Sequence, residues 1–206
     1  MLLKKSTVRK VLWGILVLGA LTIAILASRG RWKEAKISLP VIRNVPAFVF
    51  VDEDSMRITE NAFMGKVTVV DFIFTQCAGI CPLMSTKMAE LEEDFRNDPR
   101  VQFVSFSVDP ANDTPEVLRN YASAYGATKG KWKFVTGDKG AIYKLTQEGF
   151  LLGVDIDASD DAILHSNRFV LVDADGAIRG YYDSEEEAGM KNLARDARTL
   201  VAEVRR

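Results

Sequence analysis

The spacing of hydrophobic and polar positions becomes regular from Ala47 onward and predicts strands that alternate with helices. The run KVTVVDFIFT is apolar almost throughout and rich in β-branched residues, which is typical of a central strand buried on both faces. A pattern of helical period opens at Pro82 and stops before Pro99, and VQFVSFSV then predicts the next strand. Within this helix, Met84 and Met88 fall on core positions, so we interpret them as packing residues.

The remaining segments continue the alternation and close it with a hairpin and a helix. They are a hairpin in FVFVDEDSMRIT that turns around Asp52 to Ser55, a helix in NDTPEVLRNYASAYG with Asp113 or Thr114 as its cap, a strand in WKFVTG, a helix in DKGAIYKLTQEGF, a hairpin in RFVLVDADGAIRGYY that turns at Asp175 and Gly176, and a closing helix from about Glu185 to Val204. This order predicts an α/β sandwich with a mixed central sheet.

The N-terminal segment has a different pattern. Residues Val11 to Ala27 are 17 consecutive uncharged residues, most of them apolar, and as a helix they would extend roughly 26 Å. We interpret this segment as an uncleaved transmembrane helix. A cleaved signal peptide is the alternative, although the apolar region is long for one and no clean A-x-A site follows it.

Charge says little about the orientation of this anchor, because basic residues flank it almost equally on both sides. An N-terminal anchor that carries a single C-terminal domain commonly serves to hold that domain outside the cytoplasm. We therefore expect residues 1–28 to be an anchor in the inner (cytoplasmic) membrane, residues 29–45 a linker, and residues 46–206 one domain on the periplasmic or extracytoplasmic side.

Composition and charge narrow the class of protein. With 206 residues of which 48% are hydrophobic, the chain is long enough to form one buried core. The first 36 residues carry eight Lys or Arg and one Glu, so the overall charge of −1 divides into +7 there and −8 in residues 37–206. An acidic domain argues against a nucleic-acid partner.

Both cysteines of the chain lie in TQCAGICP, as Cys77 and Cys81, where the predicted central strand gives way to its helix. That position places them at the carboxyl edge of the sheet, which is the usual place for a site in an open α/β fold. A helix N-terminus favours a thiolate, so we expect a lowered pKa for Cys81. A redox dithiol and a metal site both fit this pattern, whereas a structural disulfide closing so short a loop would stabilise the fold little.

The single histidine of the chain, His165, directly precedes the first strand of the terminal hairpin. If this strand runs beside the central strand, the loop that holds His165 faces the loop that holds the cysteines. Two thiolates and one imidazole suit copper, as Cu(I) or Cu(II), whereas a structural zinc site requires a fourth ligand that only a carboxylate could supply here.

Several segments taken together resemble the Sco/SenC family of cytochrome c oxidase assembly proteins over about residues 46 to 183. They are DFIFTQC, CAGICP, SFSVDPANDTPEVLRNYASAYGA, WKFVTGD and ILHSNRFVLVDADGAIRGYY. The resemblance implies a thioredoxin-like domain on an N-terminal membrane anchor, with copper bound by Cys77, Cys81 and His165. It implies a metallochaperone rather than an enzyme, whose partner is the copper-site subunit of cytochrome c oxidase or another copper protein.

The chain departs from the family pattern at Ala78, where the family usually has proline directly after the first cysteine. This change would alter copper affinity or the redox potential of the cysteine pair without removing a donor. The segment from Asp109 to Glu116 matches a family fingerprint, which we interpret as loop and cap structure rather than as ligands.

Two other classes of function stay open. A thiol-disulfide oxidoreductase that keeps partner cysteines reduced is the main alternative, although such enzymes typically have C-x-x-C spacing and a cis-proline facing the cysteines, and no proline follows Pro115. A thioredoxin-superfamily peroxidase is less favoured, because no arginine lies close in sequence to the cysteines.

Overall fold

The computed structural model describes Trp13, Leu18, Gly19 and Thr22 of the N-terminal segment, together with residues 39–153 and 166–204. The chain divides into two compact units, Met1–Ser38 and Leu39–Arg206. None of the helices formed by these described residues has the length and apolarity needed to cross a bilayer. Most of the predicted anchor lies outside the described residues.

Eight strands and four α-helices build the described part of the second unit. The strands are β1 (Arg43–Asn44), β2 (Val49–Asp52), β3 (Arg57–Thr59), β4 (Val67–Ile73), β5 (Val101–Ser107), β6 (Trp132–Thr136), β7 (Arg168–Val172) and β8 (Ala177–Asp183). The α-helices are α2 (Ile80–Asp94), α3 (Pro115–Ala124), α4 (Lys139–Lys144) and α5 (Glu187–Glu203), with a 3₁₀ turn η1 (Glu60–Phe63) and a π-helical turn η2 (Leu145–Gly149).

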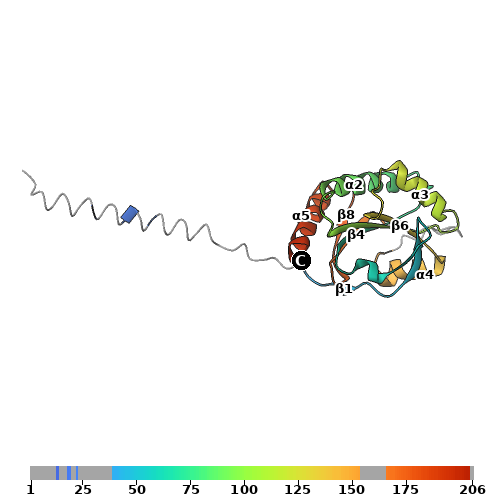
Figure 1. Cartoon of the computed structure of the whole chain (residues 1–206), viewed down its shortest axis with the longest axis horizontal. Helices are drawn as coiled ribbons and strands as arrows, with labels where there is room; N and C mark the ends of the chain where they lie inside the picture. Colours follow the sequence, from blue (N-terminus) through green and yellow to red (C-terminus); the bar gives the residue numbers. More distant parts are fainter. Residues whose placement is uncertain (1–12, 14–17, 20–21, 23–38, 154–165, 205–206) are drawn as a thin grey trace, which may run out of the picture. The chain divides into compact units, whose positions relative to one another are not determined.

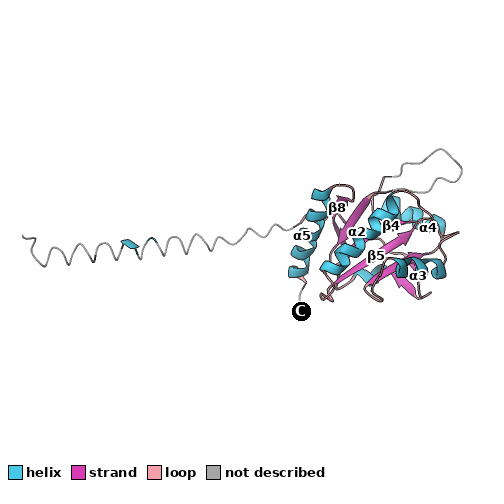
Figure 2. Cartoon of the chain, turned by 90° about the horizontal axis from the view of Figure 1, so that it is seen from above, coloured by secondary structure: helices cyan, strands magenta, loops and turns pink. Residues whose placement is uncertain are grey.

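The strands form one sheet in the order β1-β8-β7-β4-β5-β6-β2-β3. Strand β4 is central, pairing in parallel with β5 and antiparallel with β7, and all seven of its residues are buried. The predicted α/β fold with a mixed sheet is therefore confirmed, and so is the prediction that the terminal hairpin runs beside the central strand (Figure 2).

Helices cover both faces of this sheet (Figure 1). On one face, α2, α3 and α5 pack over a core that includes Met84 and Met88, each with no exposed surface, so the prediction of these methionines as core residues is confirmed. On the other face, α4 and η2 pack over a second core that is rich in phenylalanine, including Phe72 and Phe106 with ring centroids 5.4 Å apart. The two cores together account for the stability of the sheet.

Both predicted hairpin turns are confirmed. Ser55 has a φ of 61° and its N–H donates to the carbonyl oxygen of Asp52 at 2.8 Å. Gly176 has a φ of 76°, a conformation that glycine adopts without strain. These turns set the register of the flanking strands.

One predicted helix start differs from the structure, and a second one, which had two candidate caps, is decided by it. Helix α2 begins at Ile80 instead of Pro82, because the first-turn N–H groups of a helix have no intrahelical partner and Pro82 fits there without losing a bond. Cys81 therefore lies inside the helix. Of the two predicted caps of α3, Thr114 is the one that the structure shows, since its hydroxyl accepts from the N–H of Val117 at 3.3 Å.

Candidate functional site

The two cysteines lie at the carboxyl end of β4, in and after the loop that leads into α2. Both are free thiols; Cys77 is half-buried, and Cys81 is only 3% exposed. Their side chains are close enough for the sulfurs to interact. The arrangement gives one thiol that solvent and partners reach and one that the core encloses.

The predicted lowering of the pKa of Cys81 is wrong. Burial raises the pKa of the Cys81 thiol well above its usual range, and the neighbouring Cys77 adds to this effect, although a backbone hydrogen bond at Phe74 partly opposes it. The sequence pattern indicates only the helix N-terminus, whereas in the folded protein the Cys81 side chain is part of the hydrophobic core under α2, α3 and α5. In the metal-free protein, Cys81 is therefore a protonated thiol at neutral pH.

A buried carboxylate, Asp113, holds the start of the cysteine loop. It accepts hydrogen bonds from the Thr75 hydroxyl at 2.5 Å, from the Thr75 N–H at 3.2 Å and from the Ser107 hydroxyl at 2.6 Å. The local sequence pattern predicts Asp113 as a loop or cap residue, because nothing in that pattern links it to a residue 38 positions earlier.

A second buried carboxyl group, Asp71, lies in the middle of β4. It has no exposed surface, and neither of its oxygens has a hydrogen-bond partner among the described residues. Burial raises the pKa of Asp71 to about 7, although the nearby Ser105 hydroxyl partly opposes this. An acidic residue inside an otherwise apolar strand was the signal in the sequence that could have identified it.

His165, the third predicted ligand, lies outside the described residues, so its position relative to the cysteines is not described. Strand β7 starts at Arg168, and its antiparallel pairing with β4 places this start at the edge of the sheet where β4 ends. Among the described residues, no three His, Cys, Asp or Glu side chains are grouped as a metal site requires. Of the three predicted ligands, Cys77 and Cys81 are among the described residues, and the structure brings these two together.

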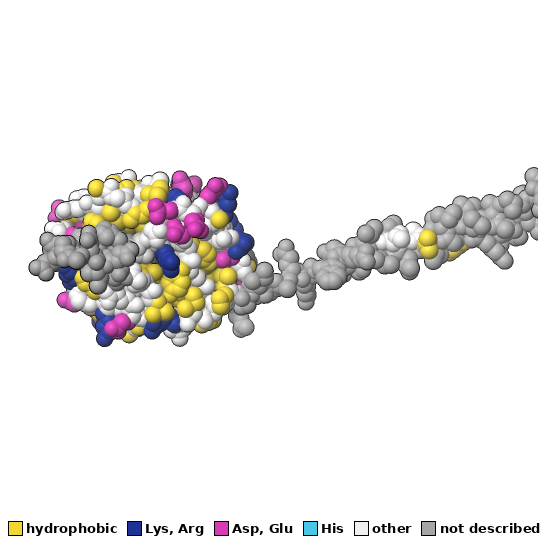
Figure 3. Space-filling view, turned by 180° about the vertical axis from the view of Figure 1, so that it is seen from behind, with side chains coloured by type: hydrophobic (Ala, Val, Ile, Leu, Met, Phe, Trp, Pro, Cys, Tyr) yellow, Lys and Arg dark blue, Asp and Glu magenta, His cyan; other side chains and the backbone are white. Residues whose placement is uncertain are grey.

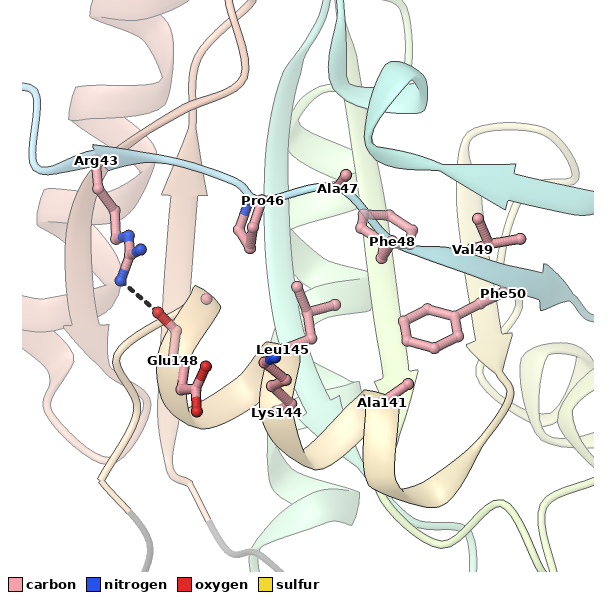
Figure 4. A pocket seen from close by; sticks show the side chains of 11 residues that line it. Arg43, Pro46, Ala47, Phe48, Val49, Phe50, Ala141, Lys144, Leu145 and Glu148 are labelled. Carbon is pink, nitrogen blue, oxygen red and sulfur yellow. Dashed lines mark hydrogen bonds between the residues drawn. The ribbon is translucent and has the colours of Figure 1, made fainter.

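The cavity drawn in Figure 4 lies apart from the thiols. It has a volume of about 280 Å³ and is lined by residues of α4 and η2, by the segment that leads into β2 and by the start of β2 itself, including Phe48, Phe50 and Leu145. These three side chains belong to the second core, on the opposite face of the sheet from Cys81. The Arg43 guanidinium donates a hydrogen bond to the backbone oxygen of Glu148 across its rim.

The back of the domain carries charged side chains of both signs, interspersed with hydrophobic ones (Figure 3). Among the described residues on this face, the Lys and Arg side chains do not gather into one continuous basic surface. The surface chemistry here differs from that of a binding face for a polyanion.

One free thiol lies in the loop after the central strand of a mixed sheet, and a second lies in the first turn of the helix that follows, which defines a dithiol site in an α/β fold. The family model described as SCO1/SenC matches residues 41–202 of this chain. The chain belongs to the SCO1/SenC family, as the resemblance predicted.

Known proteins from several sources are similar to this chain. A SCO1 protein homolog of Bacillus subtilis is 30% identical over 166 residues, which cover 80% of this chain and 86% of that protein. A putative copper-binding protein of Stutzerimonas stutzeri is 29% identical over 69% of this chain and 71% of its own length. The structure of BsSco, described as a cytochrome c oxidase assembly protein with a disulfide switch, is 28% identical, with a TM-score of 0.70 over 80% of this chain and 98% of that structure.

Proposed function

We propose that this protein is a membrane-anchored copper chaperone that serves the assembly of a cytochrome c oxidase copper centre. The observation that carries the proposal is the pair of free thiols Cys77 and Cys81 at the carboxyl edge of the sheet. Family membership supports it, together with the similarity to a putative copper-binding protein and to a Sco assembly protein.

In this proposal Cys77, Cys81 and His165 hold the copper. Thiolate sulfur and imidazole nitrogen form a soft donor set that suits copper, and the two free thiols fit such an ion chemically. The half-buried Cys77 is the ligand that a partner's thiolates reach first, while the enclosed Cys81 keeps its place in the helix. Transfer of the copper cargo then proceeds through ligands that are shared with the partner.

The redox state of the cysteines controls binding in this scheme. Metal ligation requires thiolates, so oxidation to a Cys77–Cys81 disulfide removes both sulfur donors. We expect the disulfide form to bind copper at least ~10²-fold more weakly. Binding also weakens as pH falls, because protons compete for both thiolates and for the imidazole. Equal affinity of the two redox forms, or an affinity that stays constant from neutral to mildly acidic pH, would contradict the scheme.

Reduction of a partner's cysteines is a second candidate function. The asymmetry of the pair favours it, since an accessible Cys77 beside an enclosed Cys81 is the arrangement in which one thiol attacks and the other resolves a mixed disulfide. Turnover of a model disulfide by the reduced protein, without copper binding, would make this the primary activity.

We also propose that the apolar segment from Val11 to Ala27 anchors the domain to the inner (cytoplasmic) membrane, with the domain on the periplasmic or extracytoplasmic side. The 17 uncharged residues support this proposal. Carbonate extraction of membranes, combined with protease access from the outer side, tests both the anchoring and the orientation.

Anaerobic titration with Cu(I) against a competing chelator tests the copper site. The variants are Cys77→Ser, Cys81→Ser and His165→Ala, and Ser166→Ala is the control for a change beside the histidine. We expect one tight equivalent in the parent and the control, and a large loss of affinity in the three variants. Unchanged affinity in His165→Ala, with loss in both cysteine variants, would remove His165 from the ligand set.

A further inference from the structure

We propose that Asp113 is a positioning residue of the copper site: its carboxylate fixes Thr75 and thereby the conformation of the loop that carries Cys77. The inference rests on the proposed copper function for one of its measurements only. Copper affinity then depends on a side chain whose partners are a threonine and a serine.

The contacts of Asp113 are unusual for a residue next to a helix start. Its side chain has no exposed surface, and one oxygen accepts from the Thr75 hydroxyl at 2.5 Å while the other accepts from the Ser107 hydroxyl at 2.6 Å. The Thr75 N–H adds a third donor at 3.2 Å. No Lys or Arg of the described residues forms an ion pair with this carboxylate.

Capping of α3 does not explain these contacts. The cap is Thr114, whose hydroxyl accepts from the N–H of Val117, and in the described structure the Asp113 side chain bonds only to Thr75 and Ser107. The side chain therefore turns away from the helix that follows it and toward the cysteine loop. Its role is to join two segments that are distant in sequence.

The point of attachment on the sheet is rigid. Ser107 is the last residue of β5 and is fully buried, and its hydroxyl also accepts from the N–H of Asp109 at 3.1 Å. The adjoining backbone is tied to the central strand, since the N–H of Val108 donates to the carbonyl oxygen of Ile73 at 2.8 Å. Asp113 thus ties the loop to the buried end of β5.

On the loop side, the attachment lies two residues before Cys77. The N–H of Cys77 donates to the carbonyl oxygen of Phe74 at 3.3 Å, so the turn that presents the thiol starts beside Thr75. Gly79 in the same loop is exposed, with only the Cys77 sulfur within 4 Å of where its Cβ would lie. Asp113 consequently restrains the loop two residues before Cys77, and through it the placement of the Cys77 side chain.

Residues that orient metal ligands without touching the metal typically change metal affinity by about 10- to 100-fold when they are replaced. We expect a loss of Cu(I) affinity in this range for Asp113→Ala and Asp113→Asn. Thr75→Val removes the hydroxyl bond but keeps the N–H bond, so its loss should be smaller, roughly 10-fold. Thr75→Ser restores the hydroxyl and should bind copper as the parent does.

The control variant is Asp173→Asn. Asp173 is also a buried carboxylate that accepts backbone N–H groups, but it lies at the β7–β8 turn, beyond the end of β7 that pairs with the start of β4. The Asp173→Asn variant should lower the urea concentration at the unfolding midpoint while leaving copper affinity unchanged. If the role of Asp113 is purely structural, Asp113→Asn should likewise lower the unfolding midpoint and leave copper affinity unchanged. Parental copper affinity in both Thr75→Val and Asp113→Asn would therefore overturn the proposal.

A second measurement does not involve copper. In the reduced, metal-free protein, the rate of alkylation of Cys77 by iodoacetamide reports how the loop is held, and we expect it to change at least about threefold in Thr75→Val but not in Thr75→Ser or Asp173→Asn. If the parent binds no copper, the proposed function fails and the alkylation rates alone decide the role of Asp113. If Asp113→Ala does not fold, the two Thr75 variants decide it, and unchanged rates in Thr75→Val would overturn it.

Discussion

The buried carboxyl group of Asp71 makes the stability of the reduced, metal-free protein depend on pH in an unusual direction. Burial raises the pKa of Asp71 to about 7 in the folded state, whereas an unfolded chain has an Asp pKa of about 3.9. The folded state therefore binds more protons than the unfolded state between these two values. The contribution of Asp71 to stability is fully present below about pH 4 and is lost as pH rises through 7.

The magnitude follows from the same two pKa values. A difference of about three between them corresponds to roughly 4 kcal/mol of unfolding free energy lost between about pH 4 and pH 8. The variant Asp71→Asn is neutral at every pH in this range and cannot lose it. We therefore expect the unfolding free energy of Asp71→Asn, measured relative to the parent, to rise by up to roughly 4 kcal/mol between about pH 4 and pH 8. This rise does not depend on which of the two proteins is more stable at pH 4.

Urea unfolding of parent and variant at half-unit steps from pH 4.5 to 8 measures this difference, because the other titrating groups cancel when one curve is subtracted from the other. Ser85→Ala is the control, since the Ser85 side chain of α2 is also fully buried but does not titrate. Its curve should run parallel to that of the parent. Parallel curves for Asp71→Asn and the parent would show that burial does not raise the pKa of Asp71.

Three further predictions come from packing and exposure. Gly189→Ala should lower the unfolding free energy in urea by about 1–3 kcal/mol, because the added Cβ would lie 2.4 Å from a backbone oxygen of β8. A higher unfolding free energy, which is the usual effect of this change in an exposed helix, would contradict the prediction. Iodoacetamide at pH 8 should modify Cys77 at least about tenfold faster than Cys81, which is enclosed and has a raised pKa, as peptide mass analysis over time would reveal. Arg179→Met should cost about 3–5 kcal/mol in the same unfolding assay, since it removes the guanidinium that lies 2.6 Å from the buried Asp173 carboxylate. A loss below about 1 kcal/mol would show that the ion pair is not effectively buried.

The sequence by itself determined the arrangement of the elements. The apolar run of β4, the turn residues at Ser55 and Gly176 and the helical period of α2 act over a few residues each, so local pattern is enough to predict them. The position of both cysteines at the carboxyl end of the central strand followed from the same pattern. The resemblance to the Sco/SenC family followed from motifs that can be read in order along the chain.

Only the tertiary structure decided the environment of these groups. The depth of Cys81 depends on side chains from other elements that pack around it, and this burial outweighs the effect of the helix N-terminus on its pKa. The bond between Thr75 and Asp113 joins residues 38 positions apart, and the complete burial of Asp71 depends on side chains from other elements that pack over its strand. Solvation and long-range hydrogen bonds are set by what the folded chain brings together, which a pattern of hydrophobic and polar positions does not specify.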